Sequence, residues 1–177
     1  MKKDILFINE TADELLDFKN AFAEIPGVFN FFYAFTAKEG FQILKRNTID
    51  IAFVKYGLSQ VNGLELVAAA RGFAKLRTVK IYLYEDEITR EQSEMARVLG
   101  ASGCIEKKSD ISVFVHELRA IINPQLLPNY VFLPKKVRLN LSAMLQPDPN
   151  LAMPHLFPQT LETWFSSQDR SAASSNF

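Results

Sequence analysis

The sequence predicts an α/β protein with a doubly wound, five-stranded parallel sheet and a proline-rich C-terminal extension. Over residues 4–122, short apolar runs alternate with segments of helical period, which is the pattern of a parallel sheet covered by helices. All seven glycines lie within residues 27–103, whereas seven of the eight prolines lie within residues 124–158. We therefore expect one domain over residues 4–122 and a tail without an independent fold over residues 123–177.

Five apolar runs are the expected strands of this sheet. The first, Ile5 to Ile8, has no polar residue and is typical of a strand buried on both faces. Most of the fifteen phenylalanines fall on these runs and on helix stripes, so they indicate a packed core rather than a cofactor site. The strands are expected at residues 5–8, 29–35, 49–54, 79–84 and 103–106.

The first connecting segment carries a complete set of helix signals. Asp13 is its expected N-cap, and Pro26-Gly27 ends it. A stripe of apolar residues at helical spacing would face the sheet. That stripe consists of Leu15, Phe18, Phe22 and Ile25.

Two capping boxes predict where further helices begin. Thr36 with Glu39, and Thr89 with Gln92, have the spacing at which two side chains satisfy unpaired N–H groups of a first helical turn. Gly100 is suited to end the second of these helices in a left-handed conformation. The helices are expected at 37–46, 64–73, 90–99 and after Asp110, the last with a stripe of Ile111, Phe114, Val115, Leu118, Ile121 and Ile122.

The charge balance and the termini exclude several classes of protein. Twenty Lys and Arg residues match twenty Asp and Glu residues, so no global positive field attracts nucleic acid or anionic lipid. No apolar run approaches the ~20 residues of a membrane span. The first apolar run is too short for a secretory signal, and the single cysteine cannot form an intramolecular disulfide. We expect a cytoplasmic protein that binds neither nucleic acid nor membrane.

Three stretches resemble the receiver domain of bacterial response regulators, the CheY-like family, over roughly residues 4–122. They run from Ile5 to Glu10, from Ile49 to Leu66 and from Leu99 to Lys107, and the spacings between them agree with the family. The last stretch closely resembles the family's entry to its fifth strand and the lysine that follows. The resemblance implies a flavodoxin-like sheet of order 2-1-3-4-5 and a role in two-component or phosphorelay signalling.

The resemblance also implies a site whose chemistry has changed. In the family, an aspartate after the third strand accepts phosphate, two acids hold Mg²⁺, a hydroxyl contacts the phosphate and a lysine neutralises its charge. Only the second acid and the lysine keep their chemistry here. The phosphoacceptor, the two acids, the hydroxyl, the lysine and the family's switch aromatic correspond to Lys55, Asn9, Glu10, Glu85, Lys107 and Cys104, respectively.

Lys55 argues against both phosphorylation and metal binding. It cannot form an acyl phosphate, and at ~4 Å with an effective dielectric constant of ~20 it would oppose a divalent ion by roughly 8 kcal/mol. We therefore expect no catalytic residue, no Mg²⁺ and no other cofactor. Two hypotheses for Lys55 stay open: an ammonium that replaces the metal and pairs with Glu10 and Glu85, or a side chain that reaches solvent from a decayed pocket.

The leading functional prediction is an atypical receiver that is not an enzyme, is not phosphorylated at the usual site and works as a protein-interaction module. The resemblance implies that a histidine kinase, another regulator or a second copy binds the face of the fourth helix, fifth strand and fifth helix. The tail is too short and too rich in proline for an ordinary DNA-binding output domain. The expected contacts on that face are Arg90, Glu94, Arg97, His116 and Arg119.

Two alternatives remain. A receiver still active in phosphorelay would hold phosphate or another anion between Lys55 and Lys107, or on an unusual acceptor such as Asp50, although Asp50 opens its strand at the wrong end of the sheet. A flavodoxin-like mononucleotide binder agrees less well with the loop at 9–13, which has acids and no glycine where phosphate needs bare N–H groups.

In the tail, the alternation of apolar and polar residues at 137–141 predicts a short strand, and the pattern at 160–168 predicts two helical turns.

Overall fold

Five parallel strands form one sheet in the order β2-β1-β3-β4-β5, which confirms the predicted topology. The computed structural model describes residues 2–107 and 110–124. The expected strand and helical turns of the tail lie outside these residues. The strands are β1 (Lys2–Ile8), β2 (Val28–Ala34), β3 (Ile51–Lys55), β4 (Lys80–Glu85) and β5 (Gly103–Glu106).

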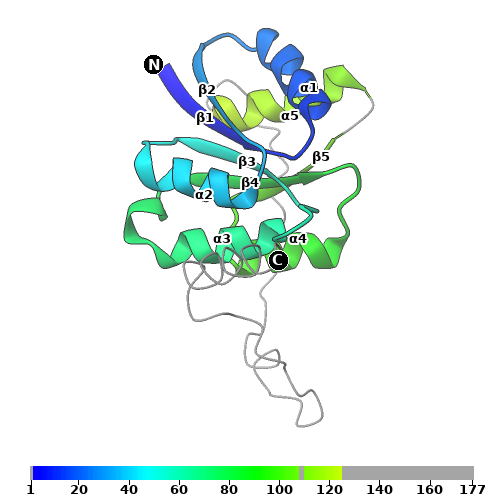
Figure 1. Ribbon diagram of the computed structural model, residues 1–177. Helices are drawn as coiled ribbons and strands as arrows, with labels where there is room; N and C mark the ends of the chain where they lie inside the picture. The colour runs from blue at the N-terminus through cyan, green and yellow to red at the C-terminus, as the bar shows by residue number, and fades with distance from the viewer. Residues whose placement is uncertain (1, 108–109, 125–177) are drawn as a thin grey trace, which may run out of the picture. The chain divides into compact units, whose positions relative to one another are not determined.

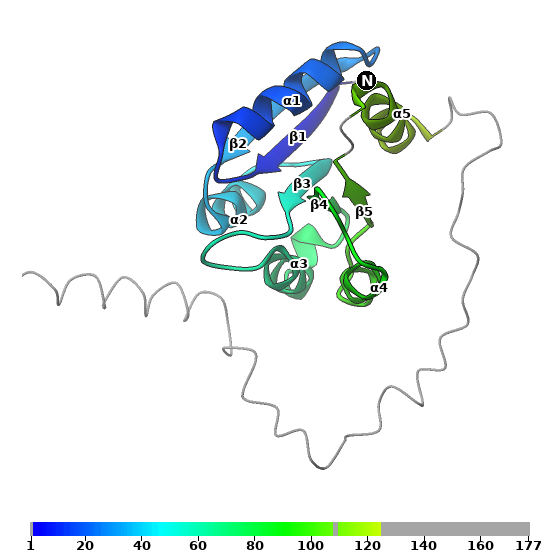
Figure 2. The same ribbon diagram turned by 90° about the vertical axis from the view of Figure 1, so that its right-hand side faces the viewer.

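The helices cover both faces of the sheet (Figure 1). Viewed along the strands, α1 and α5 lie on one face and α2, α3 and α4 on the other (Figure 2). No helix in the described ranges is long and apolar enough to cross a membrane. The helices are α1 (Ala12–Ala23), α2 (Ala37–Arg46), α3 (Gly63–Gly72), α4 (Arg90–Val98) and α5 (Ile111–Ile122), with a short 3-10 turn η1 (Ala74–Leu76) before β4.

β1 lies between β2 and β3, and this position explains its sequence. All seven of its residues pair with β2, from Lys2 opposite Val28 to Ile8 opposite Ala34. Residues 5–8 are fully buried because both neighbouring strands and both helical layers surround them. The strand begins three residues earlier than predicted, since its polar start lies at the margin of the sheet, where Lys2 is exposed and the next two residues are only partly buried.

An aromatic core fills the space between the sheet and the layer of α1 and α5. The Phe7 ring in β1 lies 4.8 Å from that of Phe18 in α1, measured between centroids, and 5.5 Å from that of Phe53 in β3. Phe18 also packs edge-on against Phe114 of α5 at 5.0 Å. The predicted use of the phenylalanines in core packing is confirmed.

The helix ends agree with most of the predicted caps. Thr36 and Thr89 accept hydrogen bonds from the N–H groups of their third helical residues, and Asp110 caps α5. The prediction for α1 was wrong, because Thr11 is its N-cap and Asp13 lies within the first turn, where a carboxylate faces the positive end of the helix dipole. Ile111 also departs from the predicted stripe, since it is exposed.

Candidate functional site

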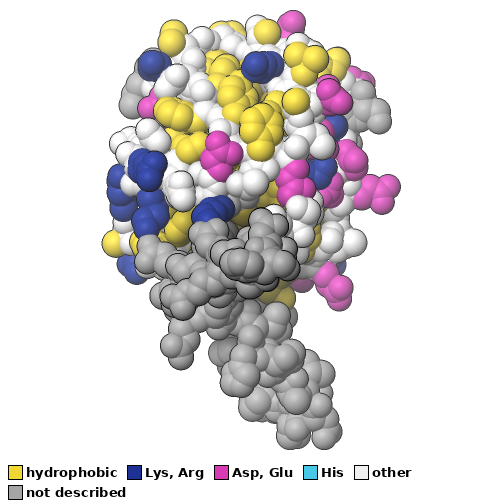
Figure 3. Space-filling view, in the orientation of Figure 1, with side chains coloured by type: hydrophobic (Ala, Val, Ile, Leu, Met, Phe, Trp, Pro, Cys, Tyr) yellow, Lys and Arg dark blue, Asp and Glu magenta, His cyan; other side chains and the backbone are white. Residues whose placement is uncertain are grey.

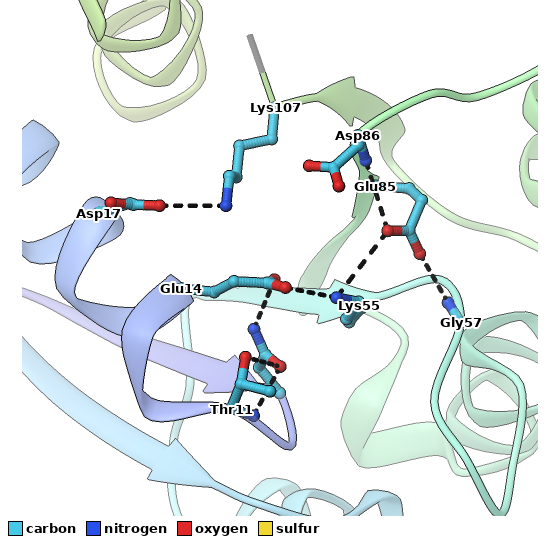
Figure 4. Close-up of polar contacts among 9 residues, drawn as sticks. Thr11, Glu14, Asp17, Lys55, Gly57, Glu85, Asp86 and Lys107 are labelled. Atoms are coloured by element: carbon cyan, nitrogen blue, oxygen red, sulfur yellow. Dashed lines mark hydrogen bonds and ion pairs between the residues drawn. The ribbon is translucent and has the colours of Figure 1, made fainter. Parts of the chain in front are cut away.

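Polar side chains gather where the strands end, at the carboxyl edge of the sheet. Asn9 follows β1, Lys55 ends β3, Glu85 ends β4 and Lys107 follows β5. Doubly wound sheets place their binding sites at this edge. The first turn of α1 borders it and contributes Glu14, which points at Lys55 (Figure 4).

The Lys55 ammonium is held between two carboxylates. Its Nζ donates a hydrogen bond to Glu14 Oε1 and lies 3.9 Å from Glu85 Oε1 (Figure 4). The side chain is 21% exposed. Burial alone would lower the Lys55 pKa, but the hydrogen bond to Glu14 and the charges of Glu14, Glu85 and Asp86 outweigh it and raise the pKa overall. Lys55 is therefore a cation within the site at neutral pH.

Asn9 fixes the orientation of Glu14. It is fully buried, and its Nδ2 donates to Glu14 Oε2 at 2.7 Å. Its Oδ1 accepts from the Thr11 N–H at 3.0 Å, and its own N–H donates to Ala34 O of β2. The amide thus ties the end of β1 to the start of α1 and directs one carboxylate oxygen of Glu14 toward Lys55.

Glu10 and Lys107 lie outside the Lys55 cluster, contrary to the predicted balance of charges. Glu10 Oε1 accepts from the Ser59 N–H at 2.9 Å and from Ser59 Oγ at 2.5 Å, so it faces the loop after β3. Lys107 Nζ lies 3.0 Å from Asp17 Oδ2 in α1. Glu14 and Asp17 of α1 supply the carboxylates that were expected from Glu10, because the helix begins directly over the strand ends.

Glu85 and the buried Tyr84 complete the surroundings of the cluster. Glu85 Oε2 accepts from the Gly57 N–H at 3.1 Å, which holds the carboxylate beside Lys55. The Tyr84 hydroxyl is buried next to the Asn9 side chain. Burial, together with the charge of Glu14, strongly raises the Tyr84 pKa, so the phenol stays neutral.

The donors at this edge do not match the needs of a divalent cation. Mg²⁺ prefers several carboxylate or carbonyl oxygens around an open position. Here Asn9 and Glu14 bond to each other, Glu10 bonds to Ser59, and Lys55 places a positive charge among the oxygens. Within residues 2–107 and 110–124, no group of three or more His, Cys, Asp or Glu side chains is arranged to hold a metal.

A groove of about 450 Å³ lies between α4 and α5, over β5. Tyr82, Ile88 and Ile121 contribute apolar surface to it, and Arg90 contributes charge. Cys104 is half-buried in its wall. Burial raises the pKa of the Cys104 thiol, although a hydrogen bond with a neighbouring serine opposes the shift, so the thiol is a weak nucleophile at neutral pH.

The expected contact residues around this groove differ in exposure. Arg90, Arg97 and His116 are exposed, and Glu94 is partly exposed and pairs with Arg90 at 2.9 Å. Arg119 is partly buried instead, because its Nη2 donates to a backbone carbonyl at the C-terminal end of α1 at 2.9 Å. It holds α5 against α1 rather than presenting its charge to a partner.

Comparison with known proteins identifies the fold. No protein-family model matches the chain, and no curated protein matches it in sequence. A CheY-like receiver domain protein of Methanospirillum hungatei JF-1 matches it in structure with a TM-score of 0.59 and 20% identity, over 71% of this chain and 97% of that one. The chain has a CheY-like receiver fold.

Two further matches show the same receiver fold in different states. The phosphorylated cyanobacterial phytochrome response regulator RcpA has a TM-score of 0.61 at 13% identity and covers 70% of this chain and 93% of its own. The Mn²⁺-bound form of response regulator Rcp1 has a TM-score of 0.61 at 12% identity and covers 75% of this chain and 99% of its own.

Sequence reasoning missed Glu14 and Asp17, because neither corresponds to a residue of the motif that the sequence resembles. Only the placement of α1 brings them to the carboxyl edge of the sheet.

Proposed function

We propose that this chain is an atypical receiver of two-component signalling that takes no phosphoryl group at the end of β3 and acts as a protein-interaction module without enzymatic activity. The observation that carries the proposal is the Lys55 ammonium, held by Glu14 and Glu85 at the position that resembles the family's phosphoacceptor. An ammonium in an ion pair has no free lone pair for attack on phosphorus.

The same cluster supports the absence of a functional Mg²⁺ site. A cation entering between Glu14 and Glu85 would have to displace Lys55 or lie within a few ångströms of its positive charge. The repulsion between the two positive charges costs several kcal/mol. Lys55 already supplies the positive charge that a metal would bring to this edge. We infer that the edge is held in one state by the chain itself, without a signal from a phosphodonor.

The alternative of anion binding between Lys55 and Lys107 agrees less well with the contacts. Each ammonium already faces a carboxylate, Glu14 and Asp17 respectively, so an anion would meet two negative groups. Asp50 is also a poor phosphoacceptor, because it precedes β3 at the amino edge of the sheet and its Oδ2 accepts from the Asp4 N–H at 2.8 Å.

The groove between α4 and α5 supports a docking role for this face. It combines apolar lining from Ile88 and Ile121 with charged residues such as Arg90, the mixture that protein interfaces use at their core and rim. We propose that a signalling protein, either a histidine kinase or another regulator, binds here. The matched proteins are described as response regulators, which agrees with that class of partner.

Incubation of the full chain with acetyl phosphate and Mg²⁺, followed by intact mass measurement, tests the proposal. We expect no gain of a phosphoryl group on the wild-type chain under conditions that label a receiver with an intact phosphoacceptor. A stable gain of one phosphoryl group would contradict the proposal, and peptide mapping would then identify the acceptor.

A pair of variants tests the role assigned to Lys55. Lys55→Asp replaces the ammonium by a carboxylate beside Glu14 and Glu85, so we expect Mg²⁺ binding to appear, measured by calorimetry, in a variant that stays folded. Lys75→Asp makes the same charge change at an exposed position in η1 and serves as the control. Equal Mg²⁺ affinity in the two variants would show that Lys55 does not keep the metal out.

A further inference from the structure

β2 is an edge strand of the five-stranded sheet, and its own sequence carries no charge. Its sequence, Val-Phe-Asn-Phe-Phe-Tyr-Ala, contains no Lys, Glu, Asp or Pro, although natural proteins commonly place such residues on exposed edges to prevent pairing. Val28 is 62% exposed, and residues 29–33 are only partly buried. Hydrophobic side chains gather over β2 on the face that looks toward the viewer in Figure 3.

Alternate backbone groups of β2 point away from the sheet. The Asn9 N–H donates to Ala34 O, so residue 34 faces β1, and by the alternation of a strand Phe29, Phe31 and Tyr33 face outward. The N–H of Phe35, which has the same parity, bonds to a Glu39 side chain and not to β1. No described residue accepts a hydrogen bond from the N–H groups of the three outward residues, so within the described part of the chain no strand occupies them.

We propose that β2 pairs antiparallel with β2 of a second copy of this chain, around a two-fold axis at Phe31. This pairing sets Phe31 opposite Phe31 and Phe29 opposite Tyr33 of the other copy, and joins the two sheets into one. The three outward residues would form about six backbone hydrogen bonds, two for each hydrogen-bonded pair. Aromatic residues directly opposite one another on antiparallel strands attract, so the strand is complementary to itself.

The charges beside β2 are also complementary under this symmetry. Lys19 of α1 lies over the Tyr33 ring, with its Nζ 5.1 Å from the centroid. Glu24, the exposed C-cap of α1, lies near the other end of β2, because α1 runs back along the strand and Phe22 packs against Phe29 at 5.2 Å. A two-fold axis at the centre of β2 therefore brings each Lys19 toward the other copy's Glu24 and toward the negative end of its helix dipole.

β2 is better suited to bind a second copy than the groove between α4 and α5 is. The groove carries charges of both signs from Arg90 and Glu117, and it belongs to the opposite edge of the sheet. Among the described residues β2 pairs with β1 alone, and its sequence has no charge and is complementary to itself. The proposal does not depend on the state of Lys55, so its success or failure is separate from that of the proposed function.

Residue-resolved amide exchange of the full chain at increasing protein concentration tests the proposal, together with mass by light scattering. We expect a dimer and at least ~tenfold slower exchange of the amides of Phe29, Phe31 and Tyr33 in it, because each becomes hydrogen-bonded. The amides of the intervening residues Asn30 and Phe32 already bond to β1 and serve as an internal control with little change. A chain that stays monomeric up to roughly millimolar concentration would overturn the proposal.

Two exposed valines provide matched variants. Val28→Lys places a charge at the end of β2 and is expected to raise the dimer dissociation constant at least ~tenfold, whereas Val98→Lys in α4 leaves it unchanged. Both positions are mostly exposed, so both variants should fold, as checked by circular dichroism. Loss of the dimer in Val98→Lys but not in Val28→Lys, with slowed exchange in β5 rather than β2, would assign the dimer to the groove and contradict the proposal.

Discussion

Asn9, Glu14 and Lys55 depend on one another. The Asn9 amide offers Glu14 an N–H donor at 2.7 Å, whereas an aspartate at the same position would place a second negative oxygen there. Glu14 in turn presents its other oxygen to Lys55. The amide, the carboxylate and the ammonium therefore form a consistent set, in which reversal of one charge leaves another group unpaired.

The coupling between Glu14 and Lys55 gives a first prediction at the residue scale. A double-mutant cycle of Glu14→Gln and Lys55→Met should give a coupling of about 1 kcal/mol in urea unfolding, because both side chains are mostly buried, at 19% and 21% exposure. The Arg90–Glu94 pair of α4 is the control, since Arg90 is 82% exposed, and should give about 0.3 kcal/mol. Equal coupling in the two pairs would contradict a special role for Lys55.

Sequence reasoning identified Lys55 and Glu85 as site residues but assigned Lys55 one wrong partner. The end of a strand can be read from an apolar run, so both positions were predicted at the carboxyl edge. Glu14 lies in a helix whose orientation over the sheet is set by tertiary packing, and no local pattern distinguishes it from Glu10. The hypothesis of an ion-paired ammonium agrees with the structure, with Glu14 in place of Glu10.

At the scale of elements, the connection from β3 to α3 depends on close packing at Gly63. Its N–H donates to Tyr56 O at 2.9 Å, so the loop returns directly over the end of β3. An added Cβ would lie 2.6 Å from Lys55 O, a backbone atom that cannot move without disturbing the strand end. The position of Lys55 thus depends on a residue without a side chain.

Two glycines of α3 give a prediction at this scale. Gly63→Ala should lower the free energy of unfolding by about 2 kcal/mol, because it overpacks the backbone beside Lys55. Gly72→Ala, at the other end of the same helix and with open space around it, should be neutral or stabilise by up to about 1 kcal/mol. Thermal or urea unfolding of the two variants measures both effects, and a neutral Gly63→Ala would show that the loop adapts easily.

The elements themselves were largely predictable, because caps and apolar periodicity are local signals. Thr89 with Gln92 and Thr36 marked helix starts correctly. The cap of α1 was assigned to Asp13 instead of Thr11, since the turn that Asn9 builds with the Thr11 N–H places the start of the helix two residues earlier. A side-chain contact that closes a turn gives no periodic signal.

At the scale of the whole molecule, the two edges of the sheet have different properties. The β5 edge carries a groove with charged lining beside α4 and α5, whereas β2 has no charged residue in its sequence and its outward backbone groups have no partner strand within residues 2–107 and 110–124. A protein with two such edges can bind a signalling partner at one and a second copy at the other. The Lys55 cluster lies at the carboxyl ends of the strands, away from the two edge strands. Its fixed charge would keep binding at both edge strands independent of phosphorylation.

The pKa of Lys55 in the folded protein tests the central claim most directly. Its contacts raise the pKa above the ordinary value of about 10.4, so the stability it contributes is present below that pH and is lost as pH rises through the folded value. NMR titration of the lysine Cε resonances should show Lys55 titrating above the exposed lysines, and Glu14→Gln should lower its pKa. A Lys55 that titrates with the exposed lysines and does not respond to Glu14→Gln would contradict an ion-paired ammonium at the end of β3.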